Sequence, residues 1–353
     1  MPTDAPVAAA ASRVLVVVPT LDEERHIDQV LHGLLAEAGD FAGLRIVVAD
    51  GGSGDGTIAR VQALAQRHPQ IALVHNPARV QSAALNLAAR GFGRDADVLI
   101  RCDAHALYPA HFCRRLIDTL ARTGADAVVV PLDSIGDSGW QRAVAWVSNS
   151  PIGTGGSAHR AGRRSGFVDH GHHAAFRMER FRGAGGYDES FTHNEDAELD
   201  CRQRALGARV YLDADIRVGY RPRPTPAGLW RQYFRYGAGR SRTARRHPGS
   251  LRLRQLAVPA HLLGSAAALA LAPVFPAALA WPALYLAALA GTSVWLALRH
   301  RSLCGLLAGP AAAVMHTAWA CGFLSALVTR REPAWRPETT RPLWAATELG
   351  AHS

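Results

Sequence analysis

The fold is decided by the stretch Val98-Leu99-Ile100-Arg101-Cys102-Asp103-Ala104-His105-Ala106. Its mostly apolar start has the length of a buried strand and stops at an aspartate, and an imidazole follows two residues later. In open α/β sheets, chemistry takes place at the carboxyl ends of the strands. The stretch therefore predicts an acid and a metal-ligating histidine at such an edge. The alternative is an ordinary strand end whose Asp103 caps a turn.

Outward from this stretch, strand-like runs alternate with helix-length segments. The runs are 14–18, 45–49, 71–74, 97–102 and 127–130, and the helical segments are 23–37, 57–67, 80–90 and 109–122. This βαβα alternation predicts a mainly parallel sheet covered by helices. Polar signatures follow three of the runs, at residues 19–24, 50–57 and 103–105. Because the ends of parallel strands share one edge, we expect their carboxylates to converge there.

The periodicity weakens between residues 131 and 195, where Gly, Ser, His and Arg are frequent. This composition favours a loop region that shapes a substrate site, in which His172 and His173 are lone imidazoles not expected to be ligands. Residues 194–200 then predict the acid-rich first turn of a helix, with Asp200 on its surface. The alternative to a functional role is that these acids only compensate the helix dipole.

Arginine supplies all 39 Lys+Arg residues, and the net charge is +10. Residues 217–254 contain eleven arginines and no acid, and the apolar stretches 256–272, 277–298 and 303–328 follow. A basic stripe beside apolar segments of this length predicts two to three membrane helices with a cytoplasmic flank. A tight hairpin or re-entrant pair over 256–298 stays open, because three spans would leave Arg330 and Arg331 outside.

Several motifs in a fixed order resemble those of family 2 glycosyltransferases. They are residues 19–24, 50–57, 103–105 and 194–196. Residues 76–86, 101–106 and 232–237 further resemble the succinoglycan-biosynthesis ExoA-like subgroup of that family. The resemblance implies an α/β, GT-A (Rossmann-like) catalytic domain with a mainly parallel sheet, followed by C-terminal transmembrane helices. A Rossmann dehydrogenase is disfavoured, because Pro19 stands where the glycine-rich turn should begin.

The resemblance also implies a binding site for the sugar donor, with Asp50 accepting the imide proton of uracil. The expected donor-binding residues are Pro19, Thr20, Glu23, Asp50, Arg79, Asn86 and Asp103. For Arg79 and Asn86, an exposed helix face is the open alternative. Asp55 is expected to cap the helix that begins at Thr57.

Asp103 and His105 stand where the family usually has two aspartates. The resemblance implies that they bind a divalent cation, and the imidazole favours Mn²⁺ over Mg²⁺. Asp196 matches the catalytic base of the family, which deprotonates the acceptor hydroxyl, and Glu195 helps to position the acceptor and diphosphate. Gln232, Arg235 and Tyr236 resemble a Gln-x-x-Arg-Trp element that holds the acceptor and diphosphate near a membrane. The alternative is an amphipathic interfacial helix.

The predicted organisation is a flexible N-terminus (1–12), a glycosyltransferase domain (13–215), a basic interfacial segment (216–255), a membrane region (256–328) and a polar tail (329–353). The N-terminus lacks a charged signal region, so the catalytic domain is expected to face the cytoplasm at a bacterial inner membrane. The expected reaction is inverting transfer of a sugar, glucose by expectation, from a UDP-sugar to a polyprenyl-diphosphate-linked acceptor in exopolysaccharide synthesis.

Other functions stay open at this stage. Within the enzyme class they are a polyprenyl-phosphate sugar synthase and a processive polysaccharide synthase. Outside it, the chain would be a membrane scaffold with a degenerate nucleotide-sugar fold. The expected partners are the donor, the lipid-linked acceptor, the membrane and other polysaccharide-assembly proteins. Nucleic acid is not expected, because the aromatic residues near the arginines adjoin a membrane segment.

Overall fold

The chain forms two compact units. The computed structural model describes residues 11–155, 164–329 and 331–344, apart from the side chains of Thr154 and His173. The first unit contains Met1–Leu132, Gly162–Gly219 and Arg336–Ser353, and the second contains Asp133–Ala161 and Tyr220–Trp335. This division differs from the continuous domain 13–215 expected from the sequence. The predicted flexible N-terminus lies outside the described residues, except for positions 11 and 12.

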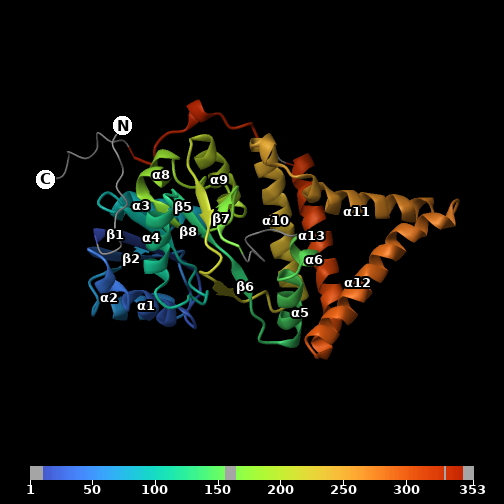
Figure 1. Ribbon diagram of the computed structural model, residues 1–353, viewed down its shortest axis with the longest axis horizontal. Coiled ribbons are helices and arrows are strands. Elements are labelled where there is room, and N and C mark those ends of the chain that lie inside the picture. The colour runs from blue at the N-terminus through green and yellow to red at the C-terminus, as the bar shows by residue number, and fades with distance from the viewer. Residues whose placement is uncertain (1–10, 156–163, 330, 345–353) are drawn as a thin grey trace. The chain divides into compact units, whose positions relative to one another are not determined.

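The first unit is built on an eight-stranded sheet in the order β3-β2-β1-β4-β8-β5-β9-β7 (Figure 1). Its strands are β1 (Arg13–Thr20), β2 (Gly43–Asp50), β3 (Ile71–His75), β4 (Val98–Arg101), β5 (Ala127–Val130), β7 (Gly166–Val168), β8 (His172–Arg177) and β9 (Val210–Leu212). Strands β1 to β4 pair in parallel, as β5 does with β9. The mainly parallel sheet is confirmed. All five predicted strands are present, and the apolar runs of β1, β2, β4 and β5 are buried, whereas in β3, at the edge of the sheet, only Ile71 is buried.

Helices accompany the strands of this unit. They are α1 (Ile27–Leu35), α2 (Thr57–Ala65), α3 (Gln81–Phe92), α4 (Phe112–Thr123), α8 (Met178–Gly183) and α9 (Glu195–Ala205), with short 3-10 turns η2 (Ala38–Asp40) and η6 (Pro337–Thr339). Each helix predicted from the periodicity is present. For α4, the apolar residues recur on one face and Gly124 ends the helix with φ +62°, a conformation that glycine adopts without strain.

The segment 131–195 is not the loop region that its weak periodicity predicted. It contains β6 (Leu132–Ser134), α5 (Gly139–Ser148), α6 (Pro151–Thr154), β7, β8 and α8. Strand β8 lies in the middle of the sheet, antiparallel to both β4 and β5. Two neighbouring strands therefore impose the extended conformation on a sequence that lacks β-branched residues. Because β8 runs against β4, its first residues lie at the edge where β4 ends.

The core of the first unit is closed by the end of the described chain. Leu343 and Trp344 pack against buried residues of the sheet, α3, α8 and α9, and the Leu343 N–H donates to the carbonyl of Arg182 at 2.9 Å. The guanidinium of Arg182 lies 5.9 Å from the centre of the Trp344 ring. Leu343 and Trp344 are thus part of the core of the first unit, although the sequence predicted a polar tail over residues 329–353.

Gly186 is a tight point beneath this segment. Its φ is +68°, and a methyl group there would collide with the Asn86 side chain. We expect Gly186→Ala to destabilise the protein by more than the roughly 1–2 kcal/mol that left-handed backbone strain costs alone. Gly183→Ala is the matched control, because nothing lies within 4 Å of the added methyl group. A drop in melting temperature for Gly186→Ala alone is the expected result; equal melting temperatures would contradict this account.

The second unit is mainly helical. It contains α5 and α6, then α10 (Pro226–Arg246), α11 (Leu253–Leu271), α12 (Ala280–Arg299) and α13 (Ala308–Thr329), with 3-10 turns η3 (Pro248–Ser250), η4 (Pro276–Leu279) and η5 (Leu303–Leu307). Strand β10 (Val218–Tyr220) ends where this unit resumes. Among the described residues, two stretches are long and apolar enough to cross a membrane, Pro276–Arg299 and Leu303–Thr329. The first predicted segment, now α11, is not one of them.

Candidate active site

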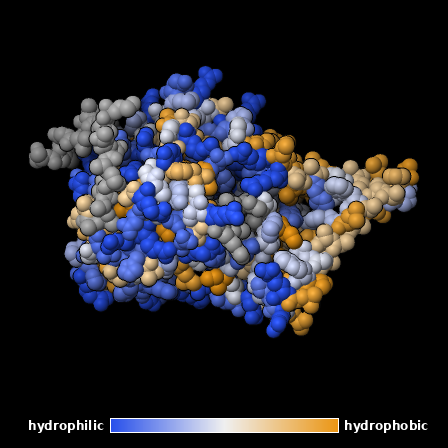
Figure 2. All heavy atoms as spheres, in the orientation of Figure 1, coloured by the Kyte–Doolittle hydropathy of each residue, from blue (hydrophilic) through white to orange (hydrophobic). Residues whose placement is uncertain are grey.

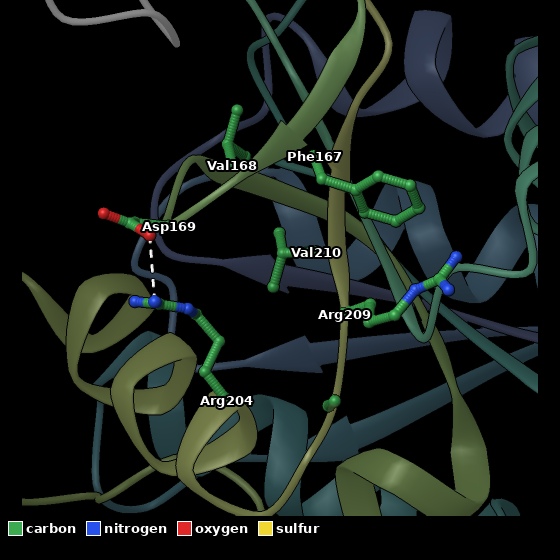
Figure 3. Close-up of a pocket in the computed structure, with 7 residues that line it drawn as sticks. Phe167, Val168, Asp169, Arg204, Arg209 and Val210 are labelled. Atoms are coloured by element: carbon green, nitrogen blue, oxygen red, sulfur yellow. Dashed lines mark ion pairs between the residues drawn. The ribbon is translucent and has the colours of Figure 1, made fainter.

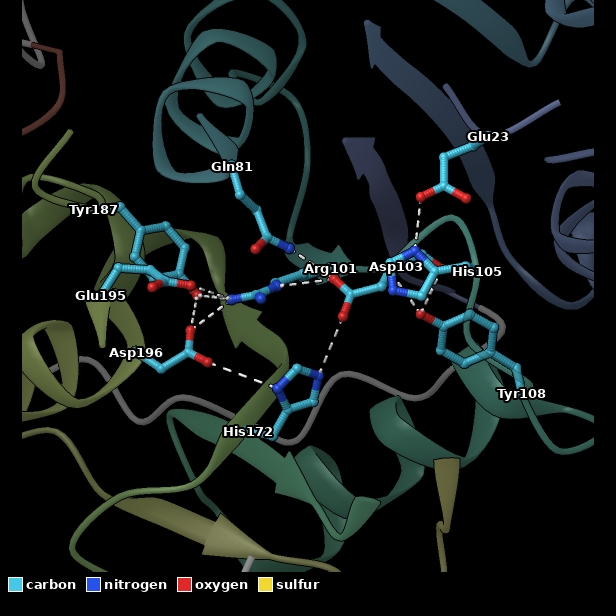
Figure 4. Close-up of polar contacts among 10 residues, drawn as sticks. All are labelled: Glu23, Gln81, Arg101, Asp103, His105, Tyr108, His172, Tyr187, Glu195 and Asp196. Carbon is cyan, nitrogen blue, oxygen red and sulfur yellow. Dashed lines mark hydrogen bonds and ion pairs between the residues drawn. The ribbon is translucent and has the colours of Figure 1, made fainter. Parts of the chain in front are cut away.

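A buried guanidinium lies at the centre of the candidate site (Figure 4). Arg101, the last residue of β4, is 5% exposed. Its Nη1 lies 2.5 Å from Asp196 Oδ1 and 3.4 Å from Glu195 Oε1, and its Nε lies 3.5 Å from Asp103 Oδ1. The Tyr187 hydroxyl donates to Asp196 at 3.0 Å. The guanidinium of Arg101 thus joins Asp103, which follows β4, to the two carboxylates at the start of α9.

Charge compensation keeps Arg101 ionised despite its burial, whereas burial favours the neutral form of Glu195. Burial opposes the charge of Arg101, yet the surrounding carboxylates raise its pKa well above the ordinary value, so the group stays cationic. Burial and the neighbouring Asp196 raise the pKa of Glu195 to about 7, against the opposing effect of Arg101. Glu195 therefore changes its protonation near neutral pH. The start of α9 also favours negative charge at both carboxylates, because the helix dipole is positive there.

Asp103 lies just beyond β4, as the sequence predicted, and is oriented from several sides. Its Oδ1 accepts a hydrogen bond from Gln81 Nε2 at 2.6 Å, and its backbone N–H donates to the Tyr108 hydroxyl at 2.5 Å. Burial alone would raise the pKa of Asp103, but Arg101 and the nearby histidines hold it below its usual value. The carboxylate is therefore anionic at neutral pH.

His105 is paired with a carboxylate from another strand end. Its Nδ1 lies 2.7 Å from Oε1 of Glu23, which follows β1. The sequence assigned Glu23 to the nucleoside, whereas here it orients the imidazole. A carboxylate on one ring nitrogen is the usual support of a metal-ligating histidine.

His172 bridges the two sides of the site. Its Nε2 lies 3.7 Å from Asp103 Oδ2 and its Nδ1 lies 3.7 Å from Asp196 Oδ2. The antiparallel direction of β8 brings this residue to the edge where β4 ends. His172 was not expected to be a ligand, and it lies between the carboxylates of Asp103 and Asp196. The side chain of His173 lies outside the described residues.

Asp50 is 3% exposed at the end of β2 and is held by four donors. The backbone N–H groups of Gly52 and Ser53 donate to its Oδ1 at 2.8 Å, and the hydroxyls of Ser53 and Thr20 donate to its Oδ2 at 2.6 and 3.0 Å. Burial raises its pKa, but these hydrogen bonds lower it below the usual value. A carboxylate has about four acceptor positions, so Asp50 is nearly saturated before any ligand arrives. Pro19 lies beside this group and is half-buried.

Asn86, Arg79 and Asp55 are the other positions for which the sequence predicted a role. Asn86 is 1% exposed, so the alternative of an exposed helix face is wrong for it. Its amide accepts from the Tyr187 N–H at 2.9 Å and donates to the Tyr187 carbonyl at 2.8 Å, which positions the tyrosine that contacts Asp196. Arg79 is exposed, with φ +57°. Asp55 accepts hydrogen bonds from the N–H and hydroxyl of Thr57, the first residue of α2, but the N-cap position itself is Gly56, so Asp55 orders the turn before the helix and is not its N-cap.

Helix α9 buries more polar groups than its sequence suggested. Asp200 is 0% exposed, and the N–H of Gly171 donates to it at 3.2 Å, so the prediction that it lies on the surface is wrong. Arg202 pairs with Glu198 one turn before it and donates to the carbonyls of Ala184 and Gly186. These bonds fix the helix that carries Glu195 and Asp196 to the loop before Tyr187.

The Gln-x-x-Arg-Tyr element lies on α10 in the second unit. Gln232 Nε2 donates to the hydroxyls of Tyr220 at 2.7 Å and Tyr236 at 3.0 Å, and Arg235 is exposed. The glutamine is therefore oriented by two tyrosines, one of which is the residue that replaces tryptophan in the motif.

The carboxylate of Asp103 and the imidazole of His105 suit a divalent cation whose other ligands are substrate oxygens. Within the part of the chain that the structure describes, no three His, Cys, Asp or Glu side chains gather into a metal site made by protein alone. Asp103 and His105 supply one carboxylate and one imidazole two residues apart. Cations that act on nucleotides are commonly held by one or two protein groups together with substrate phosphates. The residues present therefore fit a cation that binds with the diphosphate.

A pocket of about 390 Å³ lies elsewhere in the first unit (Figure 3). It is lined by residues of β7, β9 and the end of α9, including Phe167, Asp169, Arg204 and Arg209. Arg204 pairs with Asp169 at 2.9 Å, and Arg209 lies 4.3 Å above the Phe167 ring. It shares no residue with the site in Figure 4, and its charged groups are paired within the protein.

Sequence reasoning missed Arg101, His172, Tyr187 and Gln81. A signal existed for Arg101, because a charged residue inside an otherwise apolar strand needs a buried partner. No comparable signal existed for His172 and Tyr187, since their positions depend on β8 crossing the sheet and on the contact with Asn86.

Comparisons with known proteins identify the family of this chain. Residues 15–183 match the family model described as Glycosyl transferase family 2. This chain belongs to glycosyl transferase family 2. It is 42% identical, over 90% of its own length and 96% of the other, to the succinoglycan biosynthesis protein ExoA of Rhizobium meliloti (strain 1021). The predicted family and ExoA-like subgroup are thus confirmed.

A solved structure confirms the predicted GT-A fold. The chain resembles the mannosyltransferase PcManGT from Pyrobaculum calidifontis, solved in complex with GDP-Man and Mn²⁺. The TM-score is 0.60 with 23% sequence identity, over 94% of this chain and 92% of the other. At this identity the likeness establishes the fold.

Proposed function

We propose that the protein is a membrane-associated, inverting glycosyltransferase of exopolysaccharide synthesis. It moves a sugar, which we expect to be glucose, from a UDP-sugar to a polyprenyl-diphosphate-linked acceptor at the cytoplasmic face of a bacterial inner membrane. The observation that carries this proposal is the joining of Asp103 to Asp196 through Arg101 and His172. Transfer needs a place for the diphosphate beside a base for the acceptor, and this arrangement supplies both.

Asp196 is the base in this proposal. It accepts the proton of the acceptor hydroxyl while that oxygen attacks the anomeric carbon from the side opposite the diphosphate, so the configuration inverts. Arg101 and the Tyr187 hydroxyl hold its Oδ1. Because both contacts fall on one oxygen, the carboxylate plane is fixed for the incoming proton. Glu195 stands beside it as a buried group that positions the acceptor side.

Asp103 and His105 would hold a divalent cation on the diphosphate side of the site, with Mn²⁺ favoured over Mg²⁺. When bound, the cation neutralises the charge that develops on the departing diphosphate. Glu23 fixes the ring of His105, and Gln81 fixes the carboxylate of Asp103. Pro19, Thr20, Asp50, Arg79 and Asn86 form the nucleoside side of the proposal. Asp50 there acts by ordering the Gly52-Ser53 turn as well as through its own oxygens.

Gln232, Arg235 and Tyr236 bind the acceptor and its diphosphate in this proposal. A planar guanidinium suits phosphate oxygens, and Arg235 is exposed. The 42% identical relative is named for succinoglycan biosynthesis, which supports an exopolysaccharide product. Other polysaccharide-assembly proteins are expected partners for the same reason.

The proposal is tested with membranes that carry the full chain. They are incubated with a panel of labelled UDP-sugars, Mn²⁺ and bacterial lipid extract, and the lipid fraction is then analysed. We expect label from one donor in a lipid-linked oligosaccharide. Label on a monosaccharide-phosphate lipid would identify a polyprenyl-phosphate sugar synthase instead, and a long polymer would identify a processive synthase. Absence of transfer from every donor would favour the scaffold.

Chelation gives a direct prediction for the cation. EDTA is expected to stop transfer, and Mn²⁺ is expected to restore it better than Mg²⁺, because an imidazole ligand prefers the softer ion. His105→Ala should lower the transfer rate and raise the Mn²⁺ concentration needed for half-maximal transfer by about 10–100-fold. His111→Ala is the control, since His111 is an exposed histidine on the same unit. Undiminished transfer in EDTA, or unchanged Mn²⁺ dependence for His105→Ala, would exclude this role.

A further inference from the structure

Two helices of the second unit form a protruding apolar hairpin. Helices α11 and α12 diverge from the α10–α13 pair and meet at a turn over residues 272–279 (Figure 1). Large apolar side chains of this hairpin are exposed along both arms and at the turn: Leu263, Leu269, Leu271, Val274, Phe275, Trp281, Leu284 and Leu286. Figure 2 shows this hydrophobic surface gathered over the hairpin. A contiguous apolar surface of this kind marks a site of interaction.

The charges around the hairpin identify a lipid bilayer as its partner. Residues 255–298 contain no Asp, Glu, Lys or Arg. Arg252 and Arg254 lie at the start of the first arm, Arg299 ends the second arm and Arg301 follows it, so both pairs lie at the open end of the hairpin. Arginines at the ends of apolar helices suit anionic lipid headgroups. A protein partner would instead be expected to pair with charged side chains along the arms, where residues 255–298 have none.

The turn has the composition of a segment that stays inside the hydrocarbon. If the two arms crossed the bilayer, the turn would reach water on the far side, where turns are polar. Val274 is instead 88% exposed and Phe275 is 61% exposed, and residues 271–280 contain no polar side chain. Each arm is about 30 Å long, close to the thickness of the hydrocarbon, so the composition of the turn and not the length of the arms distinguishes the two topologies.

The backbone of the turn is also prepared for lipid. The N–H groups of Val274 and Phe275 donate to the Leu271 carbonyl at 3.0 and 2.8 Å, and the Ala278 N–H donates to the Phe275 carbonyl at 3.0 Å. Pro273 and Pro276 have no N–H to satisfy. In hydrocarbon an unpaired backbone donor costs several kcal/mol, so these bonds and prolines make irregular backbone tolerable there.

Helix α13 is long enough to cross a membrane, but it packs against α10, whose arginines are incompatible with hydrocarbon. Helix α10 runs beside it: Leu229 packs with the first turns of α13, Gly237 and Gly322 lie where any side chain would strike the other helix, and Arg245 donates to the Ala326 carbonyl. Helix α10 carries six arginines. Placing α13 across the bilayer would draw these into hydrocarbon, at roughly 2.5–3.5 kcal/mol each for central positions.

We propose that the protein is monotopic: the α11–α12 hairpin enters the bilayer from one side, turns within it and returns, and the chain never crosses. The inference rests on the proposed membrane association and goes beyond it. Arginines before and after the apolar region then lie on one side, which removes the conflict that three spans would create for Arg331. The C-terminal segment agrees, because Leu343 packs in the catalytic core and must share its side of the membrane.

Cysteine accessibility tests this topology independently of catalysis. The full chain, with its five native cysteines replaced, carries either Val274→Cys at the turn or Gly249→Cys just before the hairpin. Gly249 is a suitable control because it is exposed and nothing surrounds its missing Cβ. We expect a membrane-impermeant maleimide to label residue 249 in inverted vesicles but not in intact cells, and to label residue 274 only after detergent is added. Labelling of residue 274 in intact cells would overturn the proposal in favour of a crossing.

A charge at the turn gives a second measurement. Val274→Glu is expected to lower binding to vesicles of equal phosphatidylglycerol and phosphatidylethanolamine by roughly a hundredfold, because the carboxylate must enter hydrocarbon. Gly249→Glu should change binding little. Equal binding of both variants, or a hairpin covered by a second copy in detergent-free solution, would contradict insertion. Retained UDP binding in these variants would separate this failure from a failure of the proposed transferase function.

Discussion

Replacing Asp196 with asparagine is expected to abolish sugar transfer while nucleotide binding persists. The amide is nearly isosteric and still accepts hydrogen bonds from Arg101 and Tyr187, but it cannot take a proton from the acceptor hydroxyl. Loss of a general base costs about 10²–10⁴-fold in rate. Transfer is measured by label in the lipid fraction and UDP binding by calorimetry on the purified full chain.

Asp118→Asn is the matched control for this substitution. Asp118 is an exposed carboxylate on α4 that pairs with Arg114 at 3.5 Å, one turn earlier on the helix. Surface pairs of this kind contribute little, so the control should transfer sugar at the normal rate. Turnover by Asp196→Asn within a few-fold of the control would exclude Asp196 as the base. Loss of UDP binding in Asp196→Asn would instead point to a role on the donor side.

Replacing Arg101 with methionine is expected to have the largest effect on stability. Removing the guanidinium leaves Asp103, Glu195 and Asp196 near one another in a buried place without their common cation. Breaking a buried pair in this way costs about 3–5 kcal/mol. Transfer should fall by about a hundredfold or more as well, since both sides of the site lose their alignment. The melting temperature of the purified protein and the transfer rate are the measurements.

The stability loss should depend on pH in a defined direction. In the native protein the pKa of Asp103 is lowered, so its ionisation stabilises the fold above the unfolded pKa and this contribution is lost as pH falls through the folded value. Without Arg101 the carboxylates ionise against burial and against one another, so their pKa values rise. The deficit of Arg101→Met should therefore be largest at neutral and alkaline pH and shrink toward about pH 5, as the carboxylates take up protons.

Arg101→Lys separates charge from geometry. Lysine restores a cation but offers a single ammonium in place of the planar fork that reaches both Asp103 and Asp196. We expect Arg101→Lys to recover a large part of the melting temperature and little of the transfer rate. Full recovery of both would mean that only the charge matters, and a pH-independent deficit in Arg101→Met would refute the electrostatic explanation.

The parts of the fold that the sequence predicted are those with strong local patterns. Strands β1, β2, β4 and β5 are continuous apolar runs, and such runs are buried in a parallel sheet whatever else the chain does. Asp50 and Asp103 could be placed because they end those runs. The site residues that directly follow an apolar run could therefore be predicted from the sequence.

The residues that were missed depend on contacts distant in sequence. Strand β8 contains histidine, alanine and arginine rather than β-branched residues, and only its two neighbours make it a strand. His172 reaches the site through that pairing. Tyr187 likewise is held through its backbone by Asn86, 101 residues earlier. No local periodicity records such a partner, so these positions followed only from the three-dimensional structure.

The docking of the C-terminal segment sets an order of events during synthesis. Leu343 and Trp344 complete a core whose first strand begins at Arg13, so this core cannot close until Trp344 has left the ribosome. The apolar hairpin emerges earlier than these two residues. With the proposed insertion of the hairpin, the nascent protein would reach the membrane with the core beside Tyr187 still open, and it would acquire a fully supported Asp196 only after insertion. Under the proposed function, catalytic competence would then follow the arrival of the protein at the membrane.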